Sequence, residues 1–220
     1  MLNGTSCSTW RLYVIVDAEA VRGRDLAWVA QQAALGGADV IQLRDKRAST
    51  RQLLEEARRV RDVTRQAGVP LIINDRVDLA LAVDAEGVHL GHEDLPVPVA
   101  KRLLGPGKLV GRSTHSLEGA LEAERAGAEY LAVGPIYPTP TKPEYGSVGL
   151  KLIARVRAQA NRPVVCIGGI DHATLPAVLQ AGAECVAVVR AVCAADDPAE
   201  AARTLKRLVL QSVRTNASRV

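Results

Sequence analysis

Short apolar runs alternate with longer amphipathic stretches along this 220-residue chain, and this alternation constrains the fold more than any other feature. The apolar runs have the length of strands, and the stretches between them have the length of helices. The eight expected strands are Leu12–Val16, Val40–Leu43, Leu71–Ile73, Gly87–Leu90, Leu109–Gly111, Tyr130–Val133, Val164–Ile167 and Cys185–Val189. The expected helices lie near residues 25–36, 50–67, 77–83, 96–104, 116–126, 149–160, 171–181 and 198–213.

Local signals agree with this division of the chain. Glycine stands just before several apolar runs, where a helix has to stop. The residues expected to cap helix N-termini are Asp25, Thr50, Ser116 and Asp171. Strictly alternating strand–helix units favour a parallel sheet. Eight of them in this length fit a closed barrel better than an open sheet, so we predict an α/β fold, a (β/α)8 TIM barrel in a single domain.

The composition suits such a barrel. Apolar residues make up 48% of the chain, aromatic residues only 3%, and there is no Phe. A core of Ala, Val, Leu and Ile is typical of a parallel sheet that is buried on both faces. No linker or low-complexity run interrupts the pattern. We therefore expect one barrel domain over residues 11–213, a flexible N-terminal segment at 1–10 and a C-terminal tail at 214–220.

Charge and cysteine usage exclude several classes of protein. The net charge of +4 permits anionic ligands, but the basic residues are scattered and do not alternate with aromatic ones, so we expect no nucleic-acid partner. No apolar run is long enough to cross a bilayer, and residues 1–10 lack the apolar core of a secretion signal. None of the four cysteines forms a CxxC pair. We expect a cytoplasmic protein without a membrane partner, and the sequence leaves open whether it is a homo-oligomer.

Polar or glycine-rich clusters follow seven of the eight expected strands. In a TIM barrel the C-terminal ends of the strands form the active-site face. Seven clusters on one face are hard to explain as solvent-exposed decoration. They are Gln42–Lys46, Asn74–Arg76, Gly91–Asp94, Arg112–His115, Gly134–Lys142, Gly168–Ile170 and Arg190–Ala191.

The cluster Gly134–Lys142 is stiffened by one glycine and three prolines. It presents the hydroxyls of Thr139 and Thr141 and the ammonium of Lys142 together. A rigid loop of this kind suits an anionic ligand, most simply a phosphate ester. The alternative is a proline-rich connector that carries a solvated lysine.

The charged residues divide into two groups. Arg44, Lys46 and Lys142 are cations that could converge on a diphosphate. Asp75 and Asp94 follow neighbouring strands, and their like charges would repel unless a divalent cation lay between them or one stayed protonated. Oxygen ligands beside phosphate favour Mg²⁺.

Glycines offer a second phosphate site. Gly168 and Gly169 let the backbone come close to a ligand, and the helix expected to begin near Asp171 offers N–H groups to a phosphate. Ser113 has no evident base and acid to complete a triad, so we interpret it as a hydrogen-bonding residue. His115 could donate a hydrogen bond or act as a base.

Two other interpretations stay open at this point. His89 and His92 form an HxxH pattern that could indicate zinc, although no third His or Cys stands nearby. Asp45 could simply pair with Arg44 or Lys46.

Taken together, these clusters resemble the thiamine-phosphate synthase family. The resemblance covers the chain from Leu12 to Val192. Each block alone is weak, but seven in this order, each after a strand, are specific. They are QLRDK (Gln42–Lys46), INDR (Ile73–Arg76), GVHLGHEDLP (Gly87–Pro96), GRSTHS (Gly111–Ser116), GPIYPTPTK (Gly134–Lys142), IGGI (Ile167–Ile170) and AVVRA (Ala187–Ala191).

The resemblance implies an enzyme that couples an aminopyrimidine methyl diphosphate to a thiazole phosphate, with Mg²⁺, to give thiamine phosphate and diphosphate. The residues implied for the pyrimidine diphosphate are Gln42, Leu43, Arg44, Asp45, Lys46, Asn74, Ser113 and Lys142, among which Arg44, Lys46, Ser113 and Lys142 are the expected catalytic ones. Asp75 and Asp94 would bind Mg²⁺. Those implied for the thiazole phosphate are Thr139, Pro140, Thr141, Gly169, Val189 and Arg190.

The chain departs from the family pattern at two positions. His92 stands where the family often has Gln, and Arg190 stands where many members have Ser. Two rival functions remain. One is a thiazole tautomerase of the same barrel type, which would need no site for a metal-bound diphosphate. The other is a non-catalytic barrel that binds thiazole phosphate or thiamine phosphate as a sensor or carrier.

Overall fold

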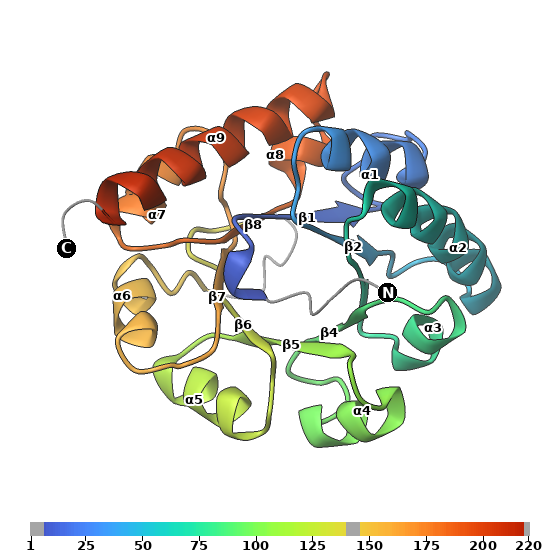
Figure 1. The fold of residues 1–220 in the computed structure, drawn as a ribbon, viewed down its shortest axis with the longest axis horizontal. Coiled ribbons are helices and arrows are strands. Elements are labelled where there is room, and N and C mark those ends of the chain that lie inside the picture. The colour runs from blue at the N-terminus through green and yellow to red at the C-terminus, as the bar shows by residue number, and fades with distance from the viewer. Residues whose placement is uncertain (1–6, 140–145, 218–220) are drawn as a thin grey trace.

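Eight parallel strands close into a barrel, and helices surround it (Figure 1). The computed structural model describes residues 7–139 and 146–217. The strands are β1 Leu12–Asp17, β2 Val40–Arg44, β3 Leu71–Asn74, β4 Gly87–Leu90, β5 Leu109–Thr114, β6 Tyr130–Val133, β7 Val164–Ile167 and β8 Val186–Val188. The helices are α1 Leu26–Leu35, α2 Thr50–Ala67, α3 Val77–Ala82, α4 Val97–Leu104, α5 Leu117–Arg125, α6 Lys151–Arg157, α7 Leu175–Gln180, α8 Arg190–Cys193 and α9 Pro198–Ala217, with a short 3₁₀ helix, η1, at Cys7–Thr9. The predicted (β/α)8 fold is confirmed.

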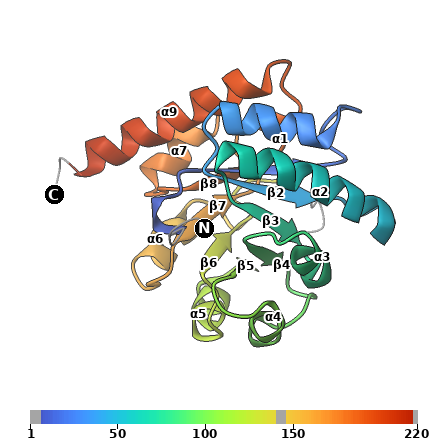
Figure 2. The ribbon, with the colours of Figure 1, turned by 45° about the vertical axis from the view of Figure 1, so that its right-hand side comes forward.

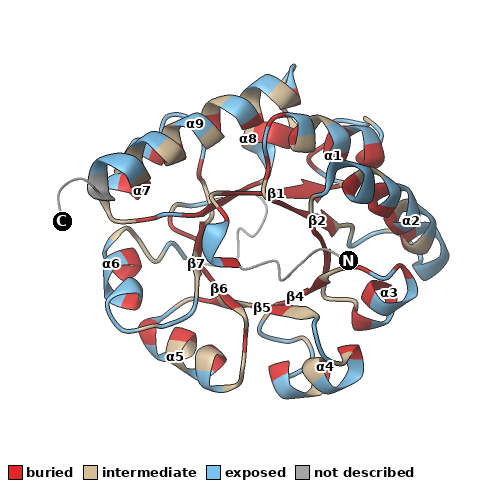
Figure 3. Cartoon of the chain, in the orientation of Figure 1, coloured by how far each residue is buried: buried red, intermediate tan, exposed pale blue. Residues whose placement is uncertain are grey.

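Each strand sends alternate side chains to the barrel interior and to the helices. In β2, Ile41 and Leu43 pack in the layer beneath the helices, whereas Val40 lies in the separate cluster inside the barrel. Gln42 and Arg44 share the inward side with Val40. The strands are accordingly buried along most of their length, and the helices are buried only on their inner faces (Figure 3).

Several element boundaries differ from the sequence-based expectation, and those of β5, β8 and α9 bear most on the description of the barrel. Strand β5 runs on to Thr114, because Arg112–Thr114 pair in register with Leu131–Val133 of β6 despite their polarity. Strand β8 ends at Val188, and the four-residue helix α8 follows it. Helix α9 runs to Ala217, so residues 214–217 continue this helix although we expected them in a tail. It packs beside α1 and α7 on the outside of the barrel (Figure 2).

The helix caps are partly as predicted. The side chains of Asp25 and Ser116 accept hydrogen bonds from the first turns of α1 and α5, which confirms both as N-caps. Thr50 is not the N-cap of α2. The N-cap is Ser49, one residue earlier, and its side chain forms a capping box with Gln52. Asp171 closes a turn by accepting from the N–H groups of residues 173 and 174, and α7 begins only after that turn.

The N-terminal end of the barrel is closed by residues that precede β1. Trp10 is 2% exposed and packs edge-on against Tyr13 and Tyr130, with ring centroids 5.8 and 5.3 Å apart. Cys7 and Trp10, which we expected in a flexible segment, are therefore buried against the barrel, and Ser8 and Thr9 between them are exposed. The open end is the opposite one, where the polar clusters gather. Among the described residues, no helix is both long and apolar enough to cross a membrane.

The capping box gives a test of the α2 boundary. We expect Ser49→Ala to lower the free energy of unfolding by about 1 kcal/mol, because the amide of Gln52 loses its acceptor. Thr50→Ala is the control, since it removes only an exposed contact with the guanidinium of Arg76. Urea unfolding of both variants checks this. A larger loss in Thr50→Ala than in Ser49→Ala would contradict the assignment.

Candidate active site

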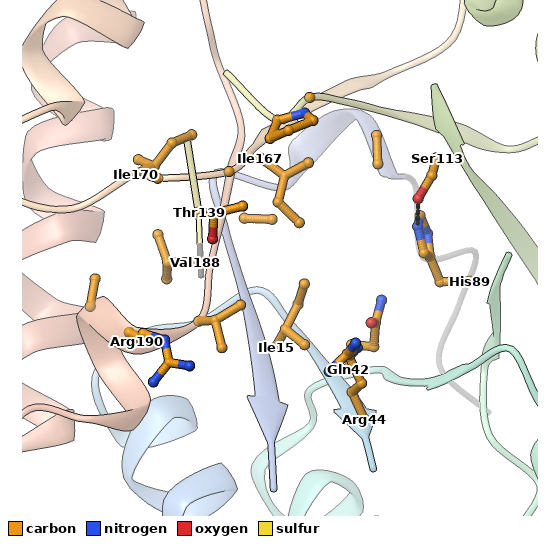
Figure 4. A pocket seen from close by; sticks show the side chains of 18 of the residues that line it. Ile15, Gln42, Arg44, His89, Ser113, Thr139, Ile167, Ile170, Val188 and Arg190 are labelled. Carbon is orange, nitrogen blue, oxygen red and sulfur yellow. Dashed lines mark hydrogen bonds between the residues drawn. The ribbon is translucent and has the colours of Figure 1, made fainter. Parts of the chain in front are cut away.

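A cavity of about 480 Å³ lies at the C-terminal ends of the strands. Residues on or directly after all eight strands line it, from Ile15 near the end of β1 to Arg190 after β8. Gln42, Arg44, His89 and Ser113 stand on one side of this cavity, and Val188, Arg190 and Ile170 on the other (Figure 4). The two predicted substrate sites thus share one space.

The side predicted to hold the pyrimidine diphosphate is assembled from inward-facing strand residues. Gln42, Arg44, Asn74 and Ser113 all line the cavity, as the sequence predicted. They come from β2, β3 and β5, so the closed barrel brings together residues that are up to about seventy positions apart in the chain. Their convergence is consistent with a binding site for a polar heterocycle next to an anionic group.

Arg44 is held by a partner that the sequence analysis missed. The carboxylate of Asp17, which is 1% exposed, accepts a hydrogen bond from the guanidinium of Arg44 and another from the backbone N–H of Glu19 at 2.8 Å. A buried, hydrogen-bonded ion pair fixes the direction of the guanidinium fork and leaves other N–H donors for a ligand. The sequence carried one signal for this partner. The alternate residues Tyr13, Ile15 and Asp17 share one side of the strand, and the last of them is a carboxylate.

Two residues predicted to contact the pyrimidine diphosphate, Leu43 and Asp45, do not line the cavity. Leu43 faces the helices and is 1% exposed in the core, so its side chain cannot meet a ligand in the barrel. The carboxylate of Asp45 accepts hydrogen bonds from the N–H groups of Arg47 and Ala48, at 2.8 and 3.0 Å. Asp45 therefore shapes the loop before α2, and it pairs with neither Arg44 nor Lys46 here.

Asp75 and Asp94 meet on the rim, as predicted. Burial and a hydrogen bond with the Asp94 carboxyl raise the pKa of Asp75, while the ammonium of Lys46, 3.1 Å from Asp75 Oδ2, opposes that rise. Asp94 is oriented by the backbone N–H of Gly91, which donates to its Oδ2 at 2.6 Å. Two oxygen ligands whose like charges repel are suited to a hard divalent cation such as Mg²⁺.

The backbone at Asp75 is also unusual. Its φ of 62° is left-handed, a region that residues other than Gly, Asn and Asp rarely adopt. Its N–H donates to the carbonyl of His89 at 2.8 Å, so the adjacent strand holds it in this conformation. Strain at such a place is typical of functional residues.

The residues that the structure describes do not support the zinc interpretation. Both ring nitrogens of His89 are engaged, Nδ1 with Tyr130 and Nε2 with Ser113. His92 is exposed on the following loop. No group of three His, Cys, Asp or Glu residues within 7–139 and 146–217 is arranged to bind a metal.

The side predicted to hold a phosphate is built by two loops that pack together. Ile136 and Tyr137 donate their backbone N–H groups to the carbonyls of Ile167 and Gly168, at 2.8 and 3.0 Å. A Cβ on Gly168 would lie 2.4 Å from Cβ of Pro135, and one on Gly169 would lie 2.6 Å from Cβ of Tyr137. The two glycines are therefore required for the loops to meet. A substituent at Gly169 would first displace the neighbouring loop, and only then obstruct a ligand.

Val189, Arg190 and Thr139 also line the cavity. The amides of Val192 and Cys193 donate to the carbonyl of Val189, at 3.1 and 2.8 Å, so α8 starts there. The first N–H groups of a helix have no acceptor within it, which leaves those of Arg190 and the next residue for a ligand. His115 contacts the carbonyl of Gly134 through Nδ1 and ties the loop after β5 to the loop after β6.

Three predicted residues, Pro140, Thr141 and Lys142, lie outside the described residues, and their roles stay predictions. Where the structure does describe the site, Arg44, Arg190 and backbone amides line one cavity at the open end of the barrel, and the paired carboxylates Asp75 and Asp94 stand on the same rim without lining it. Fold and site together are those of a (β/α)8 barrel of the phosphate-binding kind.

Comparison with known proteins specifies the family. Residues 12–192 match the model of the family described as thiamine monophosphate synthase. The chain is 55% identical over 201 residues to the thiamine-phosphate synthase of Chloroflexus aurantiacus, covering 91% of this chain and 93% of that one. It is 46% identical to the thiamine-phosphate synthase of Shouchella clausii, over 89% and 94% of the two chains. The solved structure of a thiamine phosphate pyrophosphorylase from Pyrococcus furiosus superposes with a TM-score of 0.86 at 38% identity, over 94% and 98% of the chains. The chain belongs to the thiamine monophosphate synthase family.

The Asp75 geometry generates a prediction about stability. We expect Asp75→Asn to be more stable than the wild type at neutral pH. An acid whose pKa is raised by folding loses stability as the pH rises through that pKa, and Asn tolerates a left-handed φ. We also expect Mg²⁺ with inorganic diphosphate to stabilise the wild type, by about 2.7 kcal/mol at one hundred times Kd, and to stabilise the variant less.

Asp78→Asn is the matched control. The guanidinium of Arg76 lowers the pKa of Asp78, so this substitution should leave stability unchanged or reduce it, and should retain the Mg²⁺ effect. Thermal unfolding with and without Mg²⁺ and diphosphate measures both quantities. A destabilised Asp75→Asn variant would contradict the raised pKa of Asp75, and a variant that keeps the full Mg²⁺ effect would show that Asp75 is not part of a cation site.

Proposed function

We propose that this protein is a thiamine-phosphate synthase. It joins an aminopyrimidine methyl diphosphate to a thiazole phosphate and releases diphosphate. The observation that carries the proposal is the single cavity, with Gln42, Arg44 and Ser113 on one side and the phosphate loops on the other. The names of the relatives support the same activity.

On the side of the cavity that carries Gln42, Arg44 and Ser113, diphosphate has to depart from the methylene carbon of the pyrimidine. Electron donation from the aminopyrimidine stabilises the cation that forms, and fixed positive groups stabilise the leaving group. The guanidinium of Arg44, held by Asp17, is one such group. Lys46 is the second: its ammonium pairs with Asp75 and its side chain is 51% exposed, so it could turn to phosphate oxygens.

Asp75 and Asp94 would hold Mg²⁺ at this end. When bound, the ion neutralises charge on the leaving diphosphate. It would also relieve the repulsion between the two carboxylates and allow Asp75 to release Lys46. Lys142 is the predicted third cation of the diphosphate site.

The second end has to hold the thiazole so that its ring nitrogen faces the methylene carbon. Its phosphate would be bound by the N–H groups at the start of α8 and by the loop around Gly168 and Gly169, and the position of both segments in the cavity lining supports this assignment. Fixing the nucleophile in this way removes an entropic barrier. A ring nitrogen attacks through its lone pair and needs no general base, which agrees with a cavity whose two histidines are both engaged in hydrogen bonds.

The tautomerase alternative is less well supported. Isomerising a thiazole phosphate requires no diphosphate site. In this chain the buried Asp17–Arg44 pair and the two facing carboxylates occupy the half of the site that such an enzyme would not use. The sensor or carrier alternative is distinguished from a synthase by an assay for product formation from both substrates.

The direct experiment incubates the purified protein with both substrates and Mg²⁺ and measures thiamine phosphate and diphosphate. We expect the two products in equal amounts, and none when EDTA is added or either substrate is left out. Rearrangement of the thiazole phosphate alone would identify a tautomerase. Tight binding without turnover would identify a sensor or carrier.

Arg44→Lys tests the diphosphate end. Lysine keeps the charge but lacks the planar fork that can hold Asp17 and a phosphate together, so we expect kcat/KM for the pyrimidine substrate to fall about 100-fold, roughly 2.7 kcal/mol. Arg59→Lys is the control, because Arg59 pairs with Asp25 and Glu56 away from the cavity. Steady-state kinetics of both variants decide, and equal rates in the two would remove Arg44 from the mechanism.

A further inference from the structure

A chain of four hydrogen bonds crosses the barrel interior next to the cavity. Gln42 Nε2 donates to the hydroxyl of Tyr13 at 2.7 Å, and the hydroxyls of Tyr13 and Tyr130 are 3.0 Å apart. The Tyr130 hydroxyl is 3.1 Å from His89 Nδ1, and His89 Nε2 is 2.9 Å from Ser113 Oγ. The last of these contacts is visible in Figure 4.

The two ends of this chain and His89 face the cavity, and the two tyrosines between Gln42 and His89 do not. Gln42, His89 and Ser113 are lining residues, whereas the two tyrosines are absent from the described lining. Tyr130 is fully buried and Tyr13 is 2% exposed. The tyrosines can therefore influence a ligand only through the residues they hold.

The surroundings fix Tyr130 in this position. A Cβ at Gly111 would lie 2.0 Å from Cζ of Tyr130 and 2.4 Å from its hydroxyl, so the glycine leaves the space that the phenol occupies. Trp10 packs edge-on against the ring, and the imidazole of His89 stacks on it with centroids 5.6 Å apart. The hydroxyl thus has one place in which to bridge Tyr13 and His89.

Each hydroxyl in the chain carries one hydrogen. Burial raises the pKa of Tyr13 and of Tyr130, so both phenols stay protonated. A hydroxyl donates only once, and a neutral imidazole donates from one nitrogen and accepts at the other. All four hydrogen bonds therefore point the same way, with donation passing either from Gln42 towards Ser113 or from Ser113 towards Gln42.

The direction of these hydrogen bonds determines which groups of Gln42 and Ser113 are presented to the cavity. When Gln42 donates to Tyr13 and the chain runs on to Ser113, the cavity meets the amide oxygen of Gln42 and the hydroxyl hydrogen of Ser113. If the direction reverses, with the amide turned over, it meets the amide NH₂ and a lone pair of Ser113. One end accepts whenever the other donates.

We propose that Tyr130 is a positioning residue for the pyrimidine half of the reaction. By linking Tyr13 to His89, it keeps Gln42 and Ser113 as a matched acceptor and donor. An aminopyrimidine, with its NH₂ donors and ring-nitrogen acceptors, requires such a pair. This inference rests on the proposed function, because it assigns the ligand as the aminopyrimidine.

Tyr130→Phe tests this by removing the hydroxyl and keeping the ring. We expect KM for the aminopyrimidine diphosphate to rise roughly tenfold, about 1.4 kcal/mol, and KM for the thiazole phosphate to stay within about twofold. Thr64→Val is the control, since it removes a buried hydroxyl that binds only the backbone of α2 and should leave both KM values unchanged. Equal rises in the two KM values of Tyr130→Phe would reduce Tyr130 to a packing role.

A double-mutant cycle adds a readout that general loss of packing would not move. If Tyr130 acts through Ser113, Tyr130→Phe should cost clearly less in a Ser113→Ala background than in the wild type. Additive effects of the two substitutions would overturn the inference.

A third measurement does not depend on turnover. The chain contains four histidines, so ¹⁵N-histidine NMR can follow the ring nitrogens of His89. We expect them to shift in Tyr130→Phe and to stay unchanged in Thr64→Val. If the wild type makes no thiamine phosphate, the proposed function fails and this spectrum still tests the chain. An unchanged His89 signal in Tyr130→Phe would show that the chain does not exist in solution.

Discussion

Closure of the parallel ladder, in which β8 pairs with β1, is the constraint on which the site depends. Because side chains alternate along a strand, a slip of one residue would turn Gln42 and Arg44 toward the helices. The observed register sets Ile15 beside Gln42 and Asp17 beside Arg44. That pairing gives the guanidinium its buried carboxylate and places the amide next to the barrel interior. The geometry of Gln42 and Arg44 in the cavity is thus a consequence of strand pairing.

The rim concentrates features that lower stability. Asp75 has a left-handed backbone, a partly buried carboxyl and a second carboxyl beside it. Gly168 and Gly169 also adopt positive φ so that two loops can meet. Such features persist because the barrel around them is well packed, and under the proposed function a bound cation or phosphate would offset their cost.

Much of the fold could be predicted from the sequence, because each strand–helix unit carries its own periodicity and glycine stop. Helix α8 was missed, since four residues are too few to show a period. The rim residues Gln42, Arg44, Asn74 and Ser113 could be predicted from their position after or within strands. Asp17 and the chain through Tyr13 and Tyr130 could not, because their roles arise from contacts between strands that lie far apart in sequence. Reading strands for inward alternation, and not only for their ends, would have indicated them.

We propose that one cavity holds both substrates, with the diphosphate and the thiazole phosphate at opposite sides. A crystal structure of the protein with Mg²⁺, diphosphate and thiamine phosphate measures this most directly. We expect diphosphate and the ion between Arg44, Asp75 and Asp94, and the phosphate of thiamine phosphate against the loop at Gly169 and the start of α8. Diphosphate bound at the α8 side, or either phosphate group bound outside this cavity, would contradict it.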